Sequence, residues 1–242
     1  MSDSILAAEG VRKRFGALVV LDGVDFSVGA GEAVGIVGPN GAGKTTLLNV
    51  LAGSLRPDHG RVLLRGGDVT RAGAARRCRL GVGRAHQVPR PFGDMTVFEN
   101  VLVGAGAGGR GRRREAYERA IAAIELCRLE ELANRRAERL GLLHRKRLEL
   151  ARALATDPSV LLLDEIGAGL TDAEADALVE TIRSLQERGI AIVWIEHIVH
   201  VLVSVVQRLV AMDGGRVIAE GDPHEVMRDA RVIDAYLGTT AA

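Results

Sequence analysis

The chain has 242 residues, of which 47% are hydrophobic and 26% charged, and its formal net charge is +1. A chain of this length can bury a sizeable core without disulfides, and this charge gives no argument for binding nucleic acid or an anionic membrane. Cys78 and Cys127 lack metal-ligand spacing, and two free thiols are typical of a reducing compartment. We expect a cytoplasmic protein without a signal peptide or membrane-spanning segment.

The first thirty residues predict two strands, over 5–11 and 18–28, joined by a turn at Phe15, Gly16 and Ala17. Apolar and polar residues alternate between Val24 and Val28, which indicates a half-buried strand. On the residues alone, Phe15 either fills a strand end or stacks on an adenine ring, and packing is favoured.

A glycine-rich segment follows the apolar strand 32–37 and precedes a helix over 46–52. It fits the pattern G-x-x-x-x-G-K-[ST], whose backbone N–H groups surround phosphates with help from the helix dipole. Lys44 is expected to reach the β- and γ-phosphates, and the Thr45 hydroxyl to bind Mg²⁺. The candidate phosphate site consists of Gly38, Pro39, Asn40, Gly41, Ala42, Gly43, Lys44, Thr45 and Thr46.

The next segment predicts short extended pieces at 61–64 and Val69. The arginines within 71–79 predict a solvated helix face, with an anion or lipid site as the alternative. A short strand then ends at Gln87, ahead of Pro89 and Pro91. A glutamine that leaves a strand into such a loop is a candidate ligand for Mg²⁺ or water.

Helical patterns dominate the middle of the chain. Helices are predicted over 96–103, 117–132 and 146–156, and the Gly- and Arg-rich segment 104–114 is predicted to be a mobile surface loop. Residues of about 90–150 are therefore expected to form a helical insertion into an α/β domain.

Residues 160–165, Val-Leu-Leu-Leu-Asp-Glu, form a second strong signal. A wholly apolar strand is typical of a parallel sheet covered on both faces, where ligands bind at the carboxyl ends of strands. Asp164 would then hold Mg²⁺ through water, and Glu165 would orient or deprotonate the attacking water. The alternative is that both acids cap the next turn.

The remaining segments complete an α/β pattern. Asp172 is predicted to cap a helix that ends at Arg188, and residues 190–195 to form another apolar strand, which places His197 on the same rim as Asp164. A core or surface role for His197 is the alternative to a γ-phosphate contact. A hairpin is predicted from 208–212 and 217–220, and closing helices over 223–227 and 231–237.

These signals occur in the order Phe15, 38–46, Gln87, Asp164–Glu165 and His197. In that order the whole chain resembles the ATP-binding subunits of ABC transporters. The stretches 84–104 and 221–238 resemble the subfamily that energises branched-chain amino-acid importers. The resemblance implies an α/β fold: a RecA-like P-loop NTPase core with a parallel sheet, an N-terminal antiparallel β subdomain and an inserted helical subdomain. The expected division is a core of 1–89 and 157–242 and a helical subdomain of 90–156.

The resemblance also implies roles for individual residues. Phe15 becomes the adenine-stacking aromatic, Gln87 the lid-loop glutamine and a metal ligand, His197 the switch histidine, and Glu165 the catalytic base. The expected cofactors are ATP and Mg²⁺, sandwiched between two ATPase subunits. Transmembrane permease subunits would dock near Gln87 and hold the chain at the inner face of the membrane, with a solute-binding protein as an indirect partner. Nucleic acid is not an expected partner.

One segment departs from the family. The signature Leu-Ser-Gly-Gly-Gln, which in the family reaches the partner's γ-phosphate, is replaced by Leu140-Gly-Leu-Leu-His144. Gly141 cannot replace the serine hydroxyl, a loss of about 1.5–3 kcal/mol and so about 10- to 100-fold in affinity. Ile166 and Thr171 are smaller departures, where the family usually has proline and aspartate or asparagine. This predicts a weak site completed by 140–144. In a heterodimer whose other member has an intact signature, one site would still hydrolyse ATP, and a homodimer is the alternative. The alternative functions are the ATPase of a lipid or lipopolysaccharide exporter and a regulatory subunit with little hydrolysis.

Overall fold

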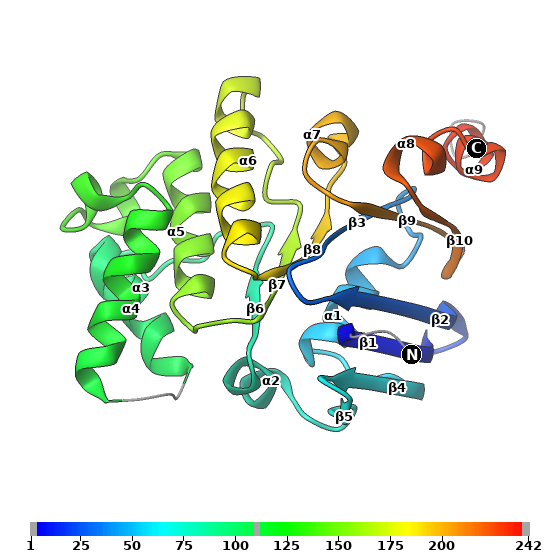
Figure 1. Ribbon diagram of the computed structural model, residues 1–242, viewed down its shortest axis with the longest axis horizontal. Coiled ribbons are helices and arrows are strands. Elements are labelled where there is room, and N and C mark those ends of the chain that lie inside the picture. The colour runs from blue at the N-terminus through cyan, green and yellow to red at the C-terminus, as the bar shows by residue number, and fades with distance from the viewer. Residues whose placement is uncertain (1–3, 109–111, 239–242) are drawn as a thin grey trace.

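The computed structural model describes residues 4–108 and 112–238, and within these residues it contains two sheets (Figure 1). The larger sheet has the order β10-β9-β3-β8-β7-β6, with β10 antiparallel to β9 and the other neighbours parallel. This confirms the predicted parallel core sheet. Its strands are β3 (Ala33–Val37), β6 (Val82–Ala85), β7 (Val160–Asp164), β8 (Ala191–Ile195), β9 (Arg208–Asp213) and β10 (Arg216–Gly221).

The smaller sheet is antiparallel, as the resemblance implies, with the order β2-β1-β4-β5. The first hairpin is longer than predicted, because Phe15 pairs with Leu18 instead of lying in the turn. Gly16 at φ 59° allows the chain to reverse within two residues. Val69 lies outside β5, contrary to the prediction. The strands are β1 (Ser4–Phe15), β2 (Leu18–Gly29), β4 (His59–Leu64) and β5 (Gly67–Asp68).

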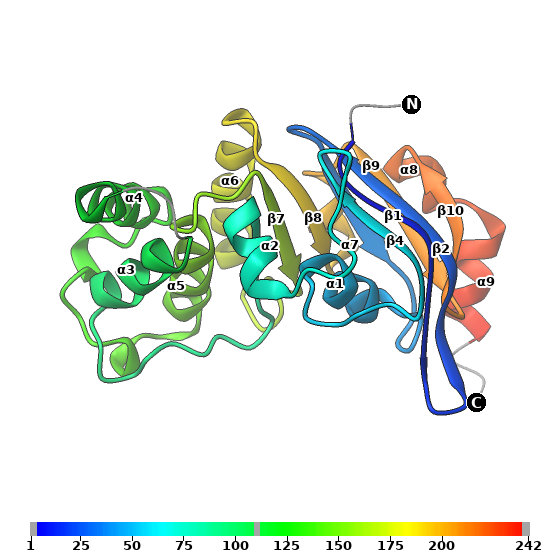
Figure 2. The ribbon, with the colours of Figure 1, turned by 90° about the horizontal axis from the view of Figure 1, so that it is seen from below.

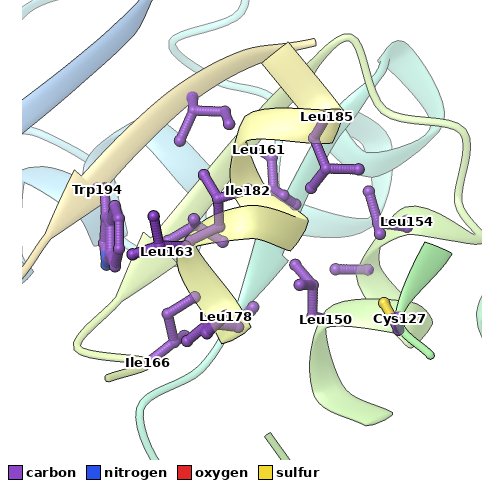
Figure 3. Packing of buried hydrophobic residues seen from close by; sticks show 14 of the residues in the cluster. Cys127, Leu150, Leu154, Leu161, Leu163, Ile166, Leu178, Ile182, Leu185 and Trp194 are labelled. Carbon is purple, nitrogen blue, oxygen red and sulfur yellow. The ribbon is translucent and has the colours of Figure 1, made fainter. Parts of the chain in front are cut away.

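The large sheet separates two hydrophobic cores. In β7, Leu161 and Leu163 join one core while Val160 and Leu162 join the other, because successive side chains point to opposite faces. Figure 3 shows the first core, where Leu161, Leu163 and Trp194 pack against helical residues. Every residue of β3, β7 and β8 is buried, which fixes the carboxyl ends of these strands at one rim.

Helices cover both faces of this sheet. The helices α6 (Asp172–Glu187) and α7 (Val199–Val203) lie on one face, and α1 (Lys44–Ala52) lies between the two sheets (Figures 1 and 2). The prediction that Asp172 caps α6 is wrong, because Asp172 is the first residue of the helix. Thr171 is the cap, because its side chain and that of Glu174 form a reciprocal capping box.

The helices α3 (Val97–Ala107), α4 (Arg113–Leu126) and α5 (Leu142–Leu154) pack on one another at one end of the molecule. Two 3₁₀ turns, Glu130–Leu132 and Ala137–Arg139, lie between α4 and α5. Residue 104 was predicted to begin a loop, but helix α3 continues through it. Glycine is needed at this position because a Cβ would lie 2.4 Å from Arg152 O, where α3 packs closely on α5. Residues 109–111 of that predicted loop lie outside the described residues. Helix α4 is earlier in the chain than predicted, and α5 begins at Leu142 instead of Lys146 because Gly141, in extended conformation, serves as its cap.

Three further helices are α2 (Ala74–Leu80), α8 (Pro223–Val226) and α9 (Ala230–Gly238). The prediction of a solvated arginine face fails at Arg77 of α2, which is 1% exposed and donates to five backbone carbonyls. Among the described residues, none of the helices combines the length and the apolar composition needed to cross a bilayer.

Candidate functional site

The glycine-rich segment 38–46 connects the buried strand β3 to helix α1. Three of its residues have positive φ: Gly38 at 147°, Gly41 at 85° and Gly43 at 98°. Gly43 caps α1 in the left-handed conformation, and a Cβ there would lie 2.7 Å from Val20 O. The loop therefore needs glycine both for its curvature and for its contact with β2. The first N–H groups of α1 lie at the loop and lack intrahelical acceptors, which suits an anion.

Lys44 is buried within this loop. Its Nζ donates to Gly38 O at 2.6 Å and to Pro39 O at 2.9 Å, and the residue is 6% exposed. Burial lowers the pKa of Lys44, and the nearby carboxylates of Glu165 and Asp164 oppose that shift. The strand ends thus bring a buried amine and two acids together, as the sequence predicts.

Asp164, the last residue of β7, is also buried. Its Oδ2 accepts a hydrogen bond of 2.9 Å from Arg84 Nη2, and Arg84 Nη1 donates to Asn49 Oδ1 at 2.6 Å. Sequence reasoning missed Arg84 and Asn49. A charged residue within the short strand 82–85 was the signal for Arg84. Arg84 fixes the orientation of the Asp164 carboxylate and leaves its Oδ1 for another ligand.

Three residues predicted to act together do meet in the structure. Gln87 Nε2 donates to Glu165 Oε2 at 2.5 Å, and His197 Nε2 shares a hydrogen bond of 2.7 Å with Glu165 Oε1. Gln87 follows β6 by two residues and is exposed, whereas the Glu165 side chain is 14% exposed. Glu165 has φ 47°, a conformation that is uncommon for a residue with a side chain, and its N–H donates to Ile195 O. Both oxygens of the carboxylate therefore have fixed directions.

Glu196 and Lys146 form a second layer that the sequence did not predict. Glu196 is 1% exposed and accepts hydrogen bonds from Gly167 N at 2.6 Å and His197 N at 3.2 Å. Burial raises the pKa of Glu196, and the charge of Lys146 opposes this. Lys146 Nζ also lies 3.5 Å from Glu165 O. These contacts join the segment after Glu165 to the segment that carries His197.

Phe15 lies at the end of β1, where the residue is 51% exposed and Lys13 Nζ lies 5.6 Å from its ring centroid. The ring is available for stacking, and its role in adenine binding stays a prediction.

The segment 140–144 forms the start of α5. Gly141 caps the helix without a side-chain hydrogen bond, and Leu142 is 48% exposed. A Cβ on Gly169 would lie 3.3 Å from Leu142 Cδ2, so this leucine packs close to the loop that follows Glu165. The first turn of α5 thus presents leucine side chains where the family signature has glycines.

The oxygen atoms at this site fit a magnesium ion that keeps much of its own coordination shell. Among the described residues no group of three or more His, Cys, Asp or Glu side chains could hold a metal. The available donors are the exposed Thr45 hydroxyl, one carboxylate oxygen of Asp164 and the Gln87 side chain. Because Mg²⁺ is usually bound through one or two protein oxygens together with waters and substrate phosphates, this donor set suits it.

Comparisons with known proteins agree with this geometry. Residues 21–168 match the family model described as ABC transporter, and residues 216–242 match the one described as branched-chain amino acid ATP-binding cassette transporter. The high-affinity branched-chain amino acid transport ATP-binding protein BraF of Pseudomonas aeruginosa is 37% identical over 98% of this chain and 99% of its own. The probable branched-chain amino acid transport ATP-binding protein LivG of Methanocaldococcus jannaschii is 34% identical over 97% of both chains.

A solved structure of an ATP-binding cassette has the same fold as this chain. A crystal structure of the ADP conformation of an ATP-binding cassette of an ABC transporter superposes with a TM-score of 0.90, at 34% identity over 98% of this chain and 100% of that one. The P-loop NTPase fold predicted from the sequence is therefore confirmed. The chain belongs to the ABC transporter family and is one of its ATP-hydrolysing subunits.

Proposed function

We propose that the loop 38–46 binds the triphosphate of ATP and that Glu165 activates the water that hydrolyses it. The loop and the first turn of α1 supply N–H donors, Lys44 supplies the positive charge, and Phe15 stacks on the adenine. A magnesium ion bound by Thr45, Asp164 and Gln87 would neutralise charge on the phosphate oxygens. The hydrogen-bonded group of Gln87, Glu165 and His197 carries this proposal.

Glu165 takes a proton from water as the water oxygen bonds to the γ-phosphorus and the bond to the ADP oxygen breaks. His197 and Gln87 hold the two carboxylate oxygens, so that Glu165 does not need to reorient during the step.

Replacement of Glu165 by glutamine tests this proposal. Glu165→Gln removes the proton acceptor and keeps the shape, so we expect ATP hydrolysis to fall by at least 100-fold while ATP binding is retained. Glu187→Gln, at the exposed end of α6, is the matched control and should keep the wild-type rate. Hydrolysis by the Glu165 variant at the wild-type rate would exclude Glu165 as the base.

We further propose that this subunit energises the import of branched-chain amino acids or related small polar solutes. The names of the two relatives and the match over 216–242 support this substrate class. Deletion of the gene in its own organism should abolish the uptake of labelled leucine, isoleucine and valine, and the wild-type gene, but not Glu165→Gln, should restore it. Unchanged uptake with impaired lipid or lipopolysaccharide export would favour the exporter alternative.

The partners in this proposal are transmembrane permease subunits and a second ATPase subunit. A groove of about 700 Å³ runs beside Gln87, and Val88, Val103 and Arg152 contribute to its walls. Its position between the β6 end and helices α3 and α5 suits a permease segment, whose docking would hold the chain at the cytoplasmic face of the membrane. A solute-binding protein would act only through the permease.

The altered segment 140–144 supports a heterodimer with unequal sites. The site that this segment completes on a partner lacks a hydroxyl donor at Gly141 and carries leucines, while the chain's own Lys44, Asp164 and Glu165 are in place. A partner with an intact signature would therefore complete the productive site.

A further inference from the structure

The C-terminal helix α9 makes a direct hydrogen bond to the phosphate loop. Gly38 N–H donates to Tyr236 Oη at 2.9 Å, between residues that lie 198 positions apart in the chain. Gly38 is the first residue of the loop and is buried. A buried N–H group is costly to leave without an acceptor, so the Tyr236 hydroxyl has a defined task at this position.

The fold brings α9 to this position through β9 and β10. β9 pairs with β3 as far as Val37 and Ala211, and a Cβ on Gly38 would lie 2.1 Å from Met212 O. Helices α8 and α9 follow β10 and lie beside β9 and β10, as both views show (Figures 1 and 2). Gly38 is thus fixed by β9 and by Tyr236.

The N–H and the carbonyl of Gly38 each form a hydrogen bond with a side chain, and only one of these two side chains is expected to bind phosphate as well. Its carbonyl accepts from Lys44, the amine that would bind phosphate. Its N–H is held by Tyr236, which comes from the segment 216–242. The hydroxyl of Tyr236 can therefore keep the loop in place whether or not Lys44 is engaged by phosphate.

We infer that Tyr236 is a positioning residue for nucleotide binding, through which α9 sets the affinity of the phosphate loop. This inference rests on the proposed role of residues 38–46. A loop that is already ordered loses less conformational freedom when its N–H groups converge on phosphate, so it binds more tightly. Tyr236 lies within the segment 216–242 that matches the branched-chain model and outside the match to the general ABC transporter model at 21–168.

The alternative is that Tyr236 only fills space. Its side chain packs against the first hydrophobic core, and burial raises its pKa. Phenylalanine would preserve this packing and remove only the hydroxyl, whereas leucine would disturb the packing as well. The pair Tyr236→Phe and Tyr236→Leu therefore separates positioning from packing.

The test measures the binding of a fluorescent ATP analogue with Mg²⁺ to the full chain, together with the melting temperature. Tyr236→Phe should bind about 3- to 10-fold more weakly, as expected for the loss of one neutral hydrogen bond, and should melt about 2–4 °C lower because the buried Gly38 N–H loses its acceptor. Tyr117→Phe is the matched control, because Tyr117 is the other tyrosine and packs on Phe98 in the helical region. It should bind as the wild type does.

A second readout follows the hydrogen bond itself. Hydrogen exchange at the Gly38 amide should be faster in Tyr236→Phe and unchanged in Tyr117→Phe. Wild-type affinity and wild-type exchange in Tyr236→Phe, with a loss of affinity only in Tyr236→Leu, would overturn the positioning role.

Lys44→Ala distinguishes this failure from a failure of the proposed function. If Lys44→Ala abolishes binding while Tyr236→Phe binds normally, the phosphate site stands and the inference about α9 is wrong. If Lys44→Ala binds as tightly as the wild type, the phosphate site is not at 38–46, and the inference fails with it.

Discussion

Glu196 shows how the fold changes the chemistry of a single residue next to the reactive group. Its carboxylate is almost fully buried, lies beside Glu165 and Lys146, and accepts N–H groups from Gly167 and His197. A Cβ on Gly167 would lie 2.2 Å from Glu196 Oε1, so glycine is required for this contact. We interpret Glu196 as the residue that holds the loop after Glu165 against the loop of His197.

Because burial raises the pKa of Glu196 above its ordinary value of 4.5, folding favours the protonated acid. The stabilisation from this group is present below pH 4.5 and is lost as the pH rises through the raised pKa. Glutamine mimics the protonated acid, so the stability of Glu196→Gln relative to the wild type should increase between pH 4.5 and neutral pH. Urea unfolding at several pH values measures this difference.

The control for this prediction is Glu125→Gln, at an exposed position of α4, whose stability should follow that of the wild type over the same range. A difference between Glu196→Gln and the wild type that is independent of pH would show that the carboxylate is ionised equally in the folded and unfolded chain.

At the scale of whole elements, the sequence predicted the parts of the site that depend on local pattern. The apolar runs 160–165 and 190–195 were predicted as strands, and the shared rim of β6, β7 and β8 explains why Gln87, Glu165 and His197 meet. The start of α6 could also have been predicted correctly, since Thr171 and Glu174 have the spacing of a capping box. The contacts of Arg84, Glu196 and Tyr236 were beyond reach, because each depends on a partner from a distant segment.

The burial of Arg77 in α2 could not be predicted from the sequence either. Four arginines lie within 71–79, and composition does not reveal that one of them points inward. Arg77 donates to the carbonyls of Val50 and Leu51 at the end of α1 and to those of Val69, Thr70 and Ala72. Burial lowers its pKa to about 10, so it stays charged at neutral pH. It joins α1, the loop after β5 and α2.

We therefore expect Arg77→Met to destabilise the chain by about 3 kcal/mol or more, because several buried carbonyls lose their donor. Arg76→Met, one residue earlier and exposed, should change stability by no more than about 0.5 kcal/mol. Urea unfolding followed by circular dichroism compares the two variants. Equal unfolding midpoints would mean that water replaces the Arg77 donors.

The whole molecule is elongated, and the first turn of α5 lies beside the loop that follows Glu165. Figures 1 and 2 both place α3, α4 and α5 at one end and β10 and α9 at the other, with α1 between them. In the proposed dimer, a chain that binds ATP at α1 relies on a second chain for the segment equivalent to 140–144. The identity of that second chain decides whether the altered segment limits hydrolysis.

Restoration of the family signature tests this dependence in the chain alone. We expect the fourfold variant to hydrolyse subsaturating ATP about 10- to 100-fold faster than the wild type, because the segment regains a hydroxyl donor and loses its two leucine side chains. The four changes are Gly141→Ser, Leu142→Gly, Leu143→Gly and His144→Gln. Steady-state phosphate release as a function of chain concentration measures the effect, and the rate should depend on dimer formation.

Adding Glu165→Gln to the fourfold variant should remove the gain in hydrolysis. An unchanged rate, in a variant that still melts cooperatively and binds ATP, would mean that 140–144 already completes a working site, and a homodimer would then replace the heterodimer as the functional unit.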